Sequence, residues 1–141
     1  MQYPLLLPIM IFLHIIDDFC LQGILAKMKQ KSWWEEQIKP MDEDRWKLYR
    51  HDWVPSLICH AFEWSFMILI PILVYSWDMM TPKSISIFMT LLVANTIVHA
   101  YVDHSKCNLM VINLITDQSI HIAQIVVTWV IWLLWIISGG V

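Results

Sequence analysis

The sequence predicts an all-α membrane protein, a four-transmembrane-helix up-down bundle with an interfacial helical segment between helices 1 and 2. The first observation is the composition: 58% of the 141 residues are hydrophobic and 15% are charged. Soluble domains of this size rarely carry so little charge. The second is that four apolar stretches reach the length needed to cross a bilayer. The third is the presence of nine tryptophans, which are typical of the aromatic belts at membrane interfaces.

The four predicted spans form a single membrane domain, at residues 3–26, 54–77, 84–105 and 117–138. No Lys or Arg and no small-residue cleavage site mark the first span as a signal peptide, so we expect a helix that stays in the chain. Pro55 suits the first turn of the second span, and Pro71 is expected to kink it. The apolar stretch 108–116 is too short to span, and we expect an interfacial or re-entrant connector there.

The segment 27–53 is the strongly polar part of the chain. It mixes acids and tryptophans with seven basic residues, Lys27, Lys29, Lys31, Lys39, Arg45, Lys47 and Arg50. This mixture predicts an amphipathic loop of one or two short interfacial helices, broken at Pro40. With Lys106 in the next loop on that side, and Lys83 alone on the other, the basic bias predicts both loops in the cytoplasm. The protein would then lie in the inner membrane with both termini outside.

The charge and the cysteines exclude some classes of protein. A net charge of −3 gives no basic footprint for nucleic acid. The three cysteines have no C-x-x-C spacing, so we expect reduced thiols or core residues rather than a disulfide framework.

Each predicted span carries polar residues at helical spacing. The first has the stripe His14, Asp18 and Gln22, at i, i+4 and i+8. The others have His60 with Glu63, then Asn95, His99 and Asp103, then Asp117, His121 and Gln124. The up-down connectivity puts all four stripes toward the cytoplasmic side, whereas the outer halves of the spans contain no ionisable residue. We therefore expect the stripes to meet in one pocket.

The acids of this pocket predict a cation site. Five carboxylates, Asp17, Asp18, Glu63, Asp103 and Asp117, face no Lys or Arg within the spans, and Lys106 lies at the boundary. Such a group must be protonated, hydrated or bound to cations. The four histidines favour cations, because His and Asp on facing helices are the ligands of di-metal bundles. Mixed nitrogen and oxygen ligands favour one or two Zn, Mn or Fe ions. The candidate ligands are His14, Asp18, His60, His99, Asp103, Asp117 and His121.

A metal-dependent membrane hydrolase is the first functional hypothesis. A bound divalent ion lowers the pKa of its water toward 7 and so supplies a nucleophile. Glu63 or Asp17 is the predicted general base. Gln22 and Gln118 are predicted to orient the substrate or stabilise an oxyanion. Lys106, with Lys27 and Lys29, would attract the anionic headgroup of a membrane lipid or lipid-linked substrate.

Two alternatives use the same residues. The protein could be non-enzymatic, binding a host membrane protein or a second copy of itself, with the cluster as a structural metal site or a hydrogen-bond network. It could also carry ions or protons. The outer halves offer only Ser65, Thr90 and Thr128 for such a path, which favours a cavity closed on that side.

Several motifs together resemble one family. His14-x3-Asp18-Phe19-x-Leu21-Gln22 resembles the H-x3-DF-x-LQ opening of the domain of unknown function 3307 family of bacterial and phage membrane proteins. Further resemblance lies in the first-loop lysine (Lys29 or Lys31), Leu57-x2-His60, His99-x3-Asp103-x2-Lys106 and Asp117-Gln118-x2-His121. Val98 stands where the family commonly has Thr. The resemblance covers most of the chain and implies a set of site residues rather than a reaction. Small membrane proteins with similar His and Asp residues are often described as metal-dependent hydrolases.

Overall fold

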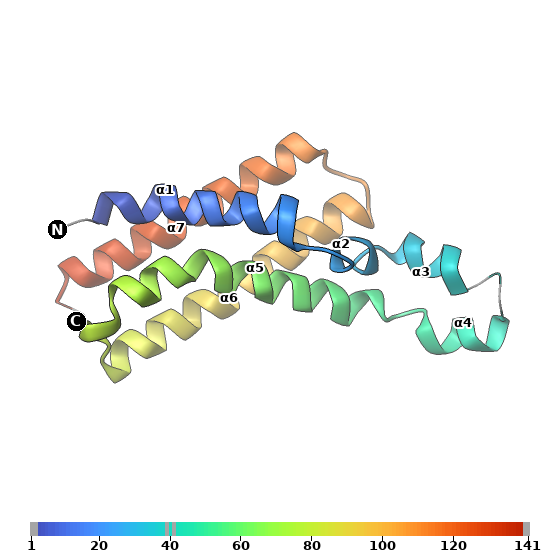
Figure 1. The fold of residues 1–141 in the computed structure, drawn as a ribbon, viewed down its shortest axis with the longest axis horizontal. Coiled ribbons are helices and arrows are strands. Elements are labelled where there is room, and N and C mark those ends of the chain that lie inside the picture. Colours follow the sequence, from blue (N-terminus) through green and yellow to red (C-terminus); the bar gives the residue numbers. More distant parts are fainter. Residues whose placement is uncertain (1–2, 39, 41, 140–141) are drawn as a thin grey trace.

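The structure is a computed structural model that describes residues 3–38, 40 and 42–139. No strand occurs among these residues, which confirms the all-helical prediction. The elements are α1 (Tyr3–Ile16), the π-helical turn η1 (Asp17–Leu21), α2 (Leu25–Met28), α3 (Lys31–Ile38), α4 (Glu43–Tyr49), α5 (Trp53–Tyr75), the 3-10 turn η2 (Trp77–Met79), α6 (Pro82–Cys107) and α7 (Leu114–Ile137). In Figure 1 the long helices lie side by side, with the start of α1, the end of α7 and the α5–α6 connection at one end and α2, α3 and α4 at the other.

Three helical segments are long and apolar enough to cross a membrane. They are Glu43–Tyr75, which contains α5, then Pro82–Cys107 and Leu114–Ile137. They correspond to the predicted second, third and fourth spans and indicate a membrane protein. The predicted first span, 3–26, is not one continuous α-helix. Its α-helical part has 14 residues, the chain then passes through η1, and Gly23 adopts the left-handed φ of +51° before α2 begins. Glycine suits this break because it has no Cβ to clash.

Side-chain caps define where the later helices begin. The Thr81 hydroxyl accepts the Ser84 amide at 3.1 Å, and Pro82 occupies the first turn of α6. The Asn113 side chain accepts the Thr116 amide at 2.9 Å. This cap starts α7 at Leu114, so the predicted connector 108–116 was too long by the first three residues of that helix.

The polar segment folds as predicted into short helices. α3 ends at Ile38 and α4 begins at Glu43, where the Asp42 side chain accepts the Asp44 amide at 2.9 Å. The break therefore falls around Pro40, as expected. Lys39, one of the seven basic residues of this segment, lies outside the described residues.

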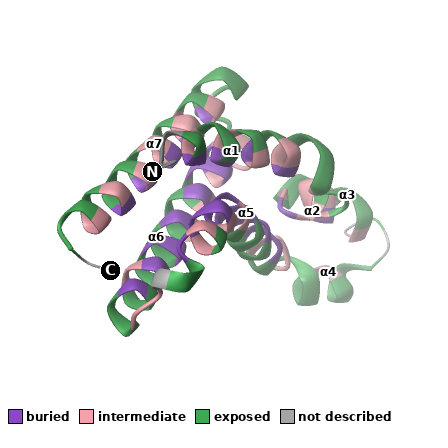
Figure 2. Ribbon diagram, turned by 60° about the vertical axis from the view of Figure 1, so that its left-hand side comes forward, coloured by how far each residue is buried: buried purple, intermediate pink, exposed green. Residues whose placement is uncertain are grey.

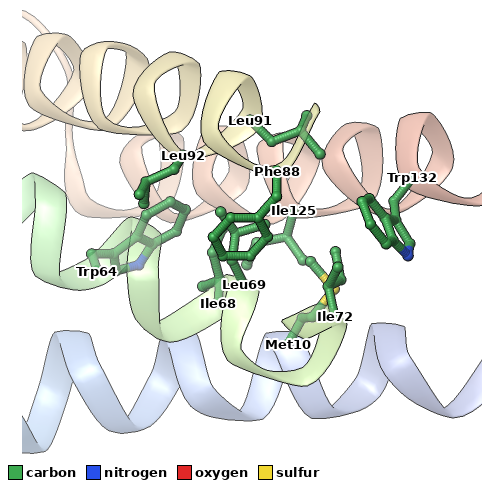
Figure 3. Packing of buried hydrophobic residues seen from close by; sticks show 10 residues of the cluster. All are labelled: Met10, Trp64, Ile68, Leu69, Ile72, Phe88, Leu91, Leu92, Ile125 and Trp132. Carbon is green, nitrogen blue, oxygen red and sulfur yellow. The ribbon is translucent and has the colours of Figure 1, made fainter. Parts of the chain in front are cut away.

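Buried residues line the long helices (Figure 2), and the apolar ones among them pack together as one core (Figure 3). Its members come from all four long helices: Met10, Trp64, Ile68, Leu69, Ile72, Phe88, Leu91, Leu92, Ile125 and Trp132. Lipid tails are as apolar as these side chains, so the packing gains mainly dispersion contacts. Buried polar residues lie beside this core, and Trp64 lies where the two groups meet.

Candidate metal centre

Residues from all four polar stripes meet at one place inside the bundle, although Glu63 of the second stripe is exposed. One histidine comes from each long helix, namely His14 on α1, His60 on α5, His99 on α6 and His121 on α7, and each is at most 1% exposed. Side chains one turn apart on a helix share a face, so each imidazole arrives with a polar neighbour.

Asp103 is the centre of the cluster, because it faces three of the four imidazoles. Its Oδ2 lies 3.2 Å from His60 Nε2 and 3.6 Å from His99 Nε2. Its Oδ1 lies 3.5 Å from His121 Nε2. The Nε2 atoms of His60 and His99 are 3.1 Å apart. Three ring nitrogens thus point at the two oxygens of one carboxylate.

Two sets of these residues could hold a metal ion. They are Asp18, His60 and His99, and His99, Asp103 and His121, and within each set the ligand atoms lie within 4.8 Å of one another. On the His121 side, Nε2 also lies 3.4 Å from Asp117 Oδ1. A tetrahedral ion with bonds of about 2.0–2.2 Å has neighbouring ligand atoms roughly 3.4 Å apart. His121 Nε2 and Asp117 Oδ1 are buried and form no hydrogen bond. These donors therefore fit a divalent ion in both kind and spacing.

Stacking, rather than hydrogen bonding, orients the rings. The Nδ1 atoms of His60, His99 and His121 form no hydrogen bond, although metal-bound histidines usually donate from the second nitrogen. Instead the His99 ring stacks between Trp64 and His121, with centroids 4.2 Å from each. Aromatic packing from Trp64 thus stands in for the usual second hydrogen bond. No pattern in the sequence singled out Trp64 for this role.

His14 belongs to neither set. Trp64 Nε1 donates to His14 Nδ1 at 2.8 Å, and an indole N–H can only donate. Nδ1 of His14 is therefore an acceptor engaged by Trp64, which argues against the predicted ligand role for that atom. His14 Nδ1 also lies 3.6 Å from Asp18 Oδ2, which places His14 at the edge of the cluster.

The predicted spans contain no Lys or Arg, but two lysines from just outside them pair with the buried acids. The Lys29 ammonium donates to Asp103 Oδ2 at 2.5 Å, and Lys106 donates to Asp117 Oδ2 at 2.7 Å. Lys29 was predicted at the rim, yet it is buried. Because the helix breaks at Gly23, between Gln22 and Lys29, helical spacing along the first span does not predict this contact.

The predicted glutamines both bind Asp18. Gln22 Nε2 donates to Asp18 Oδ1 at 2.8 Å, and Gln118 Nε2 donates to Asp18 Oδ2 at 2.9 Å. Gln118 also donates to Asp117 Oδ2 at 3.1 Å. The two amides fix the orientation of the Asp18 carboxylate.

A cavity of about 220 Å³ opens beside this cluster, toward the α2 end of the bundle. Its polar lining includes the carboxylates of the two metal-competent sets, both lysines and both glutamines, namely Asp18, Asp103, Lys29, Lys106, Gln22 and Gln118. Asp18 and Asp103 are therefore reachable from the cavity, whereas the buried His60, His99 and His121 do not line it.

The other predicted residues lie apart from the cavity. Glu63 is exposed and belongs to neither metal-competent set, so the structure removes the reason for placing a general base there. Asp17 is 1% exposed, and neither carboxylate oxygen forms a hydrogen bond. Lys27 is exposed on α2.

A second polar group lies one turn from the cluster, between α6 and α7. Asn95 Nδ2 donates to Thr128 Oγ1 at 2.9 Å, and Gln124 Nε2 donates to Asn95 Oδ1 at 2.8 Å. Asn95 was part of the predicted third-span stripe, but its partners were not predicted, because spacing along a chain does not identify partners on another helix.

No family model, no curated protein and no solved structure matches this chain. The resemblance to the domain of unknown function 3307 family therefore stays a prediction, and the case for function depends on the site.

Proposed function

We propose that the protein is a metal-dependent membrane hydrolase that acts on a lipid-linked or amphiphilic substrate at the cytoplasmic leaflet. One observation supports this more than any other. The cavity has Asp18 and Asp103, members of the two metal-competent sets, in its wall beside two lysines and two amides. A catalytic metal site keeps one side open to substrate, whereas a structural site is closed.

In this proposal all four long helices cross the inner membrane, with both termini outside. α1 and η1 together run from Tyr3 to Leu21, a rise of about 28 Å at 1.5 Å per residue, close to the thickness of the hydrocarbon core. The excess of basic residues on the α2–α4 side supports placing that side in the cytoplasm. The cluster then lies near the inner boundary of the bilayer.

The side chains divide the chemistry between them. A divalent ion, when bound, supplies Lewis acidity and an activated water. Asp18 replaces Glu63 and Asp17 as the proposed general base, because it lines the cavity and two amides hold its carboxylate. Lys106 is about one-third exposed at the cavity and would attract an anionic headgroup.

The test is hydrolysis by purified protein in vesicles that contain anionic phospholipids, with Mn²⁺ or Zn²⁺ added. We expect release of a water-soluble headgroup or phosphate by the wild type and at least about 100-fold less by Asp18→Asn, as for loss of a general base. Lys27→Met, which changes an exposed residue of the same face, should retain activity. Metal-independent release, or equal rates for Asp18→Asn and the wild type, would contradict the proposal.

A structural role is the second candidate, and the lysine pairs favour it. Lys29 and Lys106 already pair with the carboxylates of α6 and α7. In this candidate the lysines neutralise the buried acids without a metal, and the protein binds a membrane partner or a second copy of itself. This candidate predicts a folded protein without metal and without hydrolysis. For an ion carrier we find no support, because no ionisable side chain is buried in the part of the interior that the apolar core fills, among the residues that the structure describes.

A further inference from the structure

The two carboxylate oxygens of Asp103 are not equivalent, because the Lys29 ammonium binds only one of them. Lys29 Nζ donates to Asp103 Oδ2, the oxygen that lies 3.2 Å from His60 Nε2 and 3.6 Å from His99 Nε2. An ion bound by His60, His99 and this oxygen would face the ammonium across a single atom. Like charges so close together repel strongly in a buried site.

The other side of Asp103 has no ammonium group next to it. Asp103 Oδ1 and Asp117 Oδ1 lie 3.5 and 3.4 Å from His121 Nε2. Lys106 binds the opposite oxygen of Asp117, Oδ2. His121 Nε2 and Asp117 Oδ1 are buried and form no hydrogen bond. His121 Nε2 therefore has one carboxylate oxygen of each aspartate within 3.5 Å, and neither of these two oxygens is the one that a lysine contacts.

Lys29 is held in its place by the backbone around it. Asn108, at the end of α6, donates its Nδ2 to the Lys29 carbonyl at 3.1 Å and accepts the Lys31 amide at 2.7 Å. The Lys29 residue is 7% exposed. Since α6 also carries Asp103, these two hydrogen bonds of Asn108 fix Lys29 relative to the carboxylate that it contacts.

The charge count favours one ion over two. Asp18, Asp103 and Asp117 with Lys29 and Lys106 carry one net negative charge when all are ionised. A single divalent ion leaves one positive charge, which an ionised Asp17, also buried, would cancel. A second divalent ion would add two more positive charges to a buried cluster, at a high cost in desolvation and repulsion.

We propose that the centre binds a single divalent ion, between His121, Asp103 and Asp117, and that the Lys29 ammonium takes the place of a second ion. This inference rests on the proposed function only in that the centre binds metal. It narrows the cofactor from one or two ions to one. It also assigns Lys29 the role of excluding a second ion. A neutral side chain at position 29 would remove that repulsion and let a second ion bind beside His60 and His99.

The experiment counts metal in wild type, Lys29→Met and the matched control Lys27→Met. Lys27 is exposed on the same short helix, so the control removes the same charge away from the cluster. Each detergent-purified protein is loaded with Mn²⁺, freed of excess ion and measured by mass spectrometry of the elements. We expect about one ion per chain in wild type and Lys27→Met, and about two in Lys29→Met. Two ions in the wild type, or one in a folded Lys29→Met, would overturn the inference.

Electron paramagnetic resonance of the Mn²⁺-loaded wild type gives a second test that needs no variant. We expect the hyperfine pattern of an isolated ion. A spin-coupled spectrum would contradict the single-ion centre while leaving the proposed hydrolase intact. A wild type that binds no ion would contradict both proposals, so the two failures are distinguishable.

Discussion

Replacement of Asp103 by Asn tests how the buried charges stabilise the bundle. Asp103 is 3% exposed and contacts Lys29, whose side chain is 9% exposed. Asp103→Asn keeps the shape but leaves the Lys29 ammonium buried and unpaired. Loss of one partner of a buried pair costs about 3–5 kcal/mol. We expect the free energy of unfolding to fall by that amount, measured by circular dichroism during SDS titration of detergent-solubilised, metal-free protein.

The double variant Asp103→Asn/Lys29→Met separates this cost from simple loss of packing. Because the unpaired ammonium is the cause, removing it as well should recover most of the loss, to within about 2 kcal/mol of wild type. Asp44→Asn breaks an exposed pair with Lys47 and should cost less than about 1 kcal/mol. The reasoning is refuted if Asp103→Asn is as mild as Asp44→Asn, or if the double variant loses more stability than the single one.

Three further substitutions test single contacts by the same titration. Trp64→Phe keeps an aromatic ring but leaves His14 Nδ1 without its donor, and we expect a loss of about 1–3 kcal/mol; an unchanged midpoint would show that this hydrogen bond contributes nothing. Asn95→Ala removes the hydrogen bonds with Thr128 and Gln124 and should cost about 0.6–2 kcal/mol, and a stabilised protein would argue against the network. Gly23→Ala meets no steric clash but forces Ala to φ +51°, so we expect a loss of about 1 kcal/mol, and no loss would mean that the turn relaxes.

The sequence predicted the long helices and the meeting of the stripes because both follow from periodicity. The apolar lengths located α5, α6 and α7 to within three residues at each end. The spacing of His14 with Asp18 and of His99 with Asp103 identified faces that do meet in the structure, where Asp18 and Asp103 both contact His60. Helix length and residue spacing are local signals. The up-down connectivity then predicted that the polar ends of the helices lie on the same side of the bundle.

The features that were missed depend on contacts between distant segments. The contact of Lys29 with Asp103 depends on the turn at Gly23 and on the hydrogen bond from Asn108 to the Lys29 carbonyl. Glu63 was assigned to the pocket, yet it is exposed while Trp64 is buried. α5 is apolar nearly all round, so its pattern does not show which face is inward.

The most direct test of the account is the metal content of detergent-purified protein, compared between wild type, His121→Ala and His104→Ala. His121 contacts the Asp103 and Asp117 carboxylates and belongs to a metal-competent set, whereas His104 stacks on Trp53. We expect bound Zn, Mn or Fe in wild type and His104→Ala, and its loss from a folded His121→Ala. A wild type without bound metal, or a His121→Ala that retains it, would contradict the central claim that the buried imidazoles and carboxylates form a metal centre.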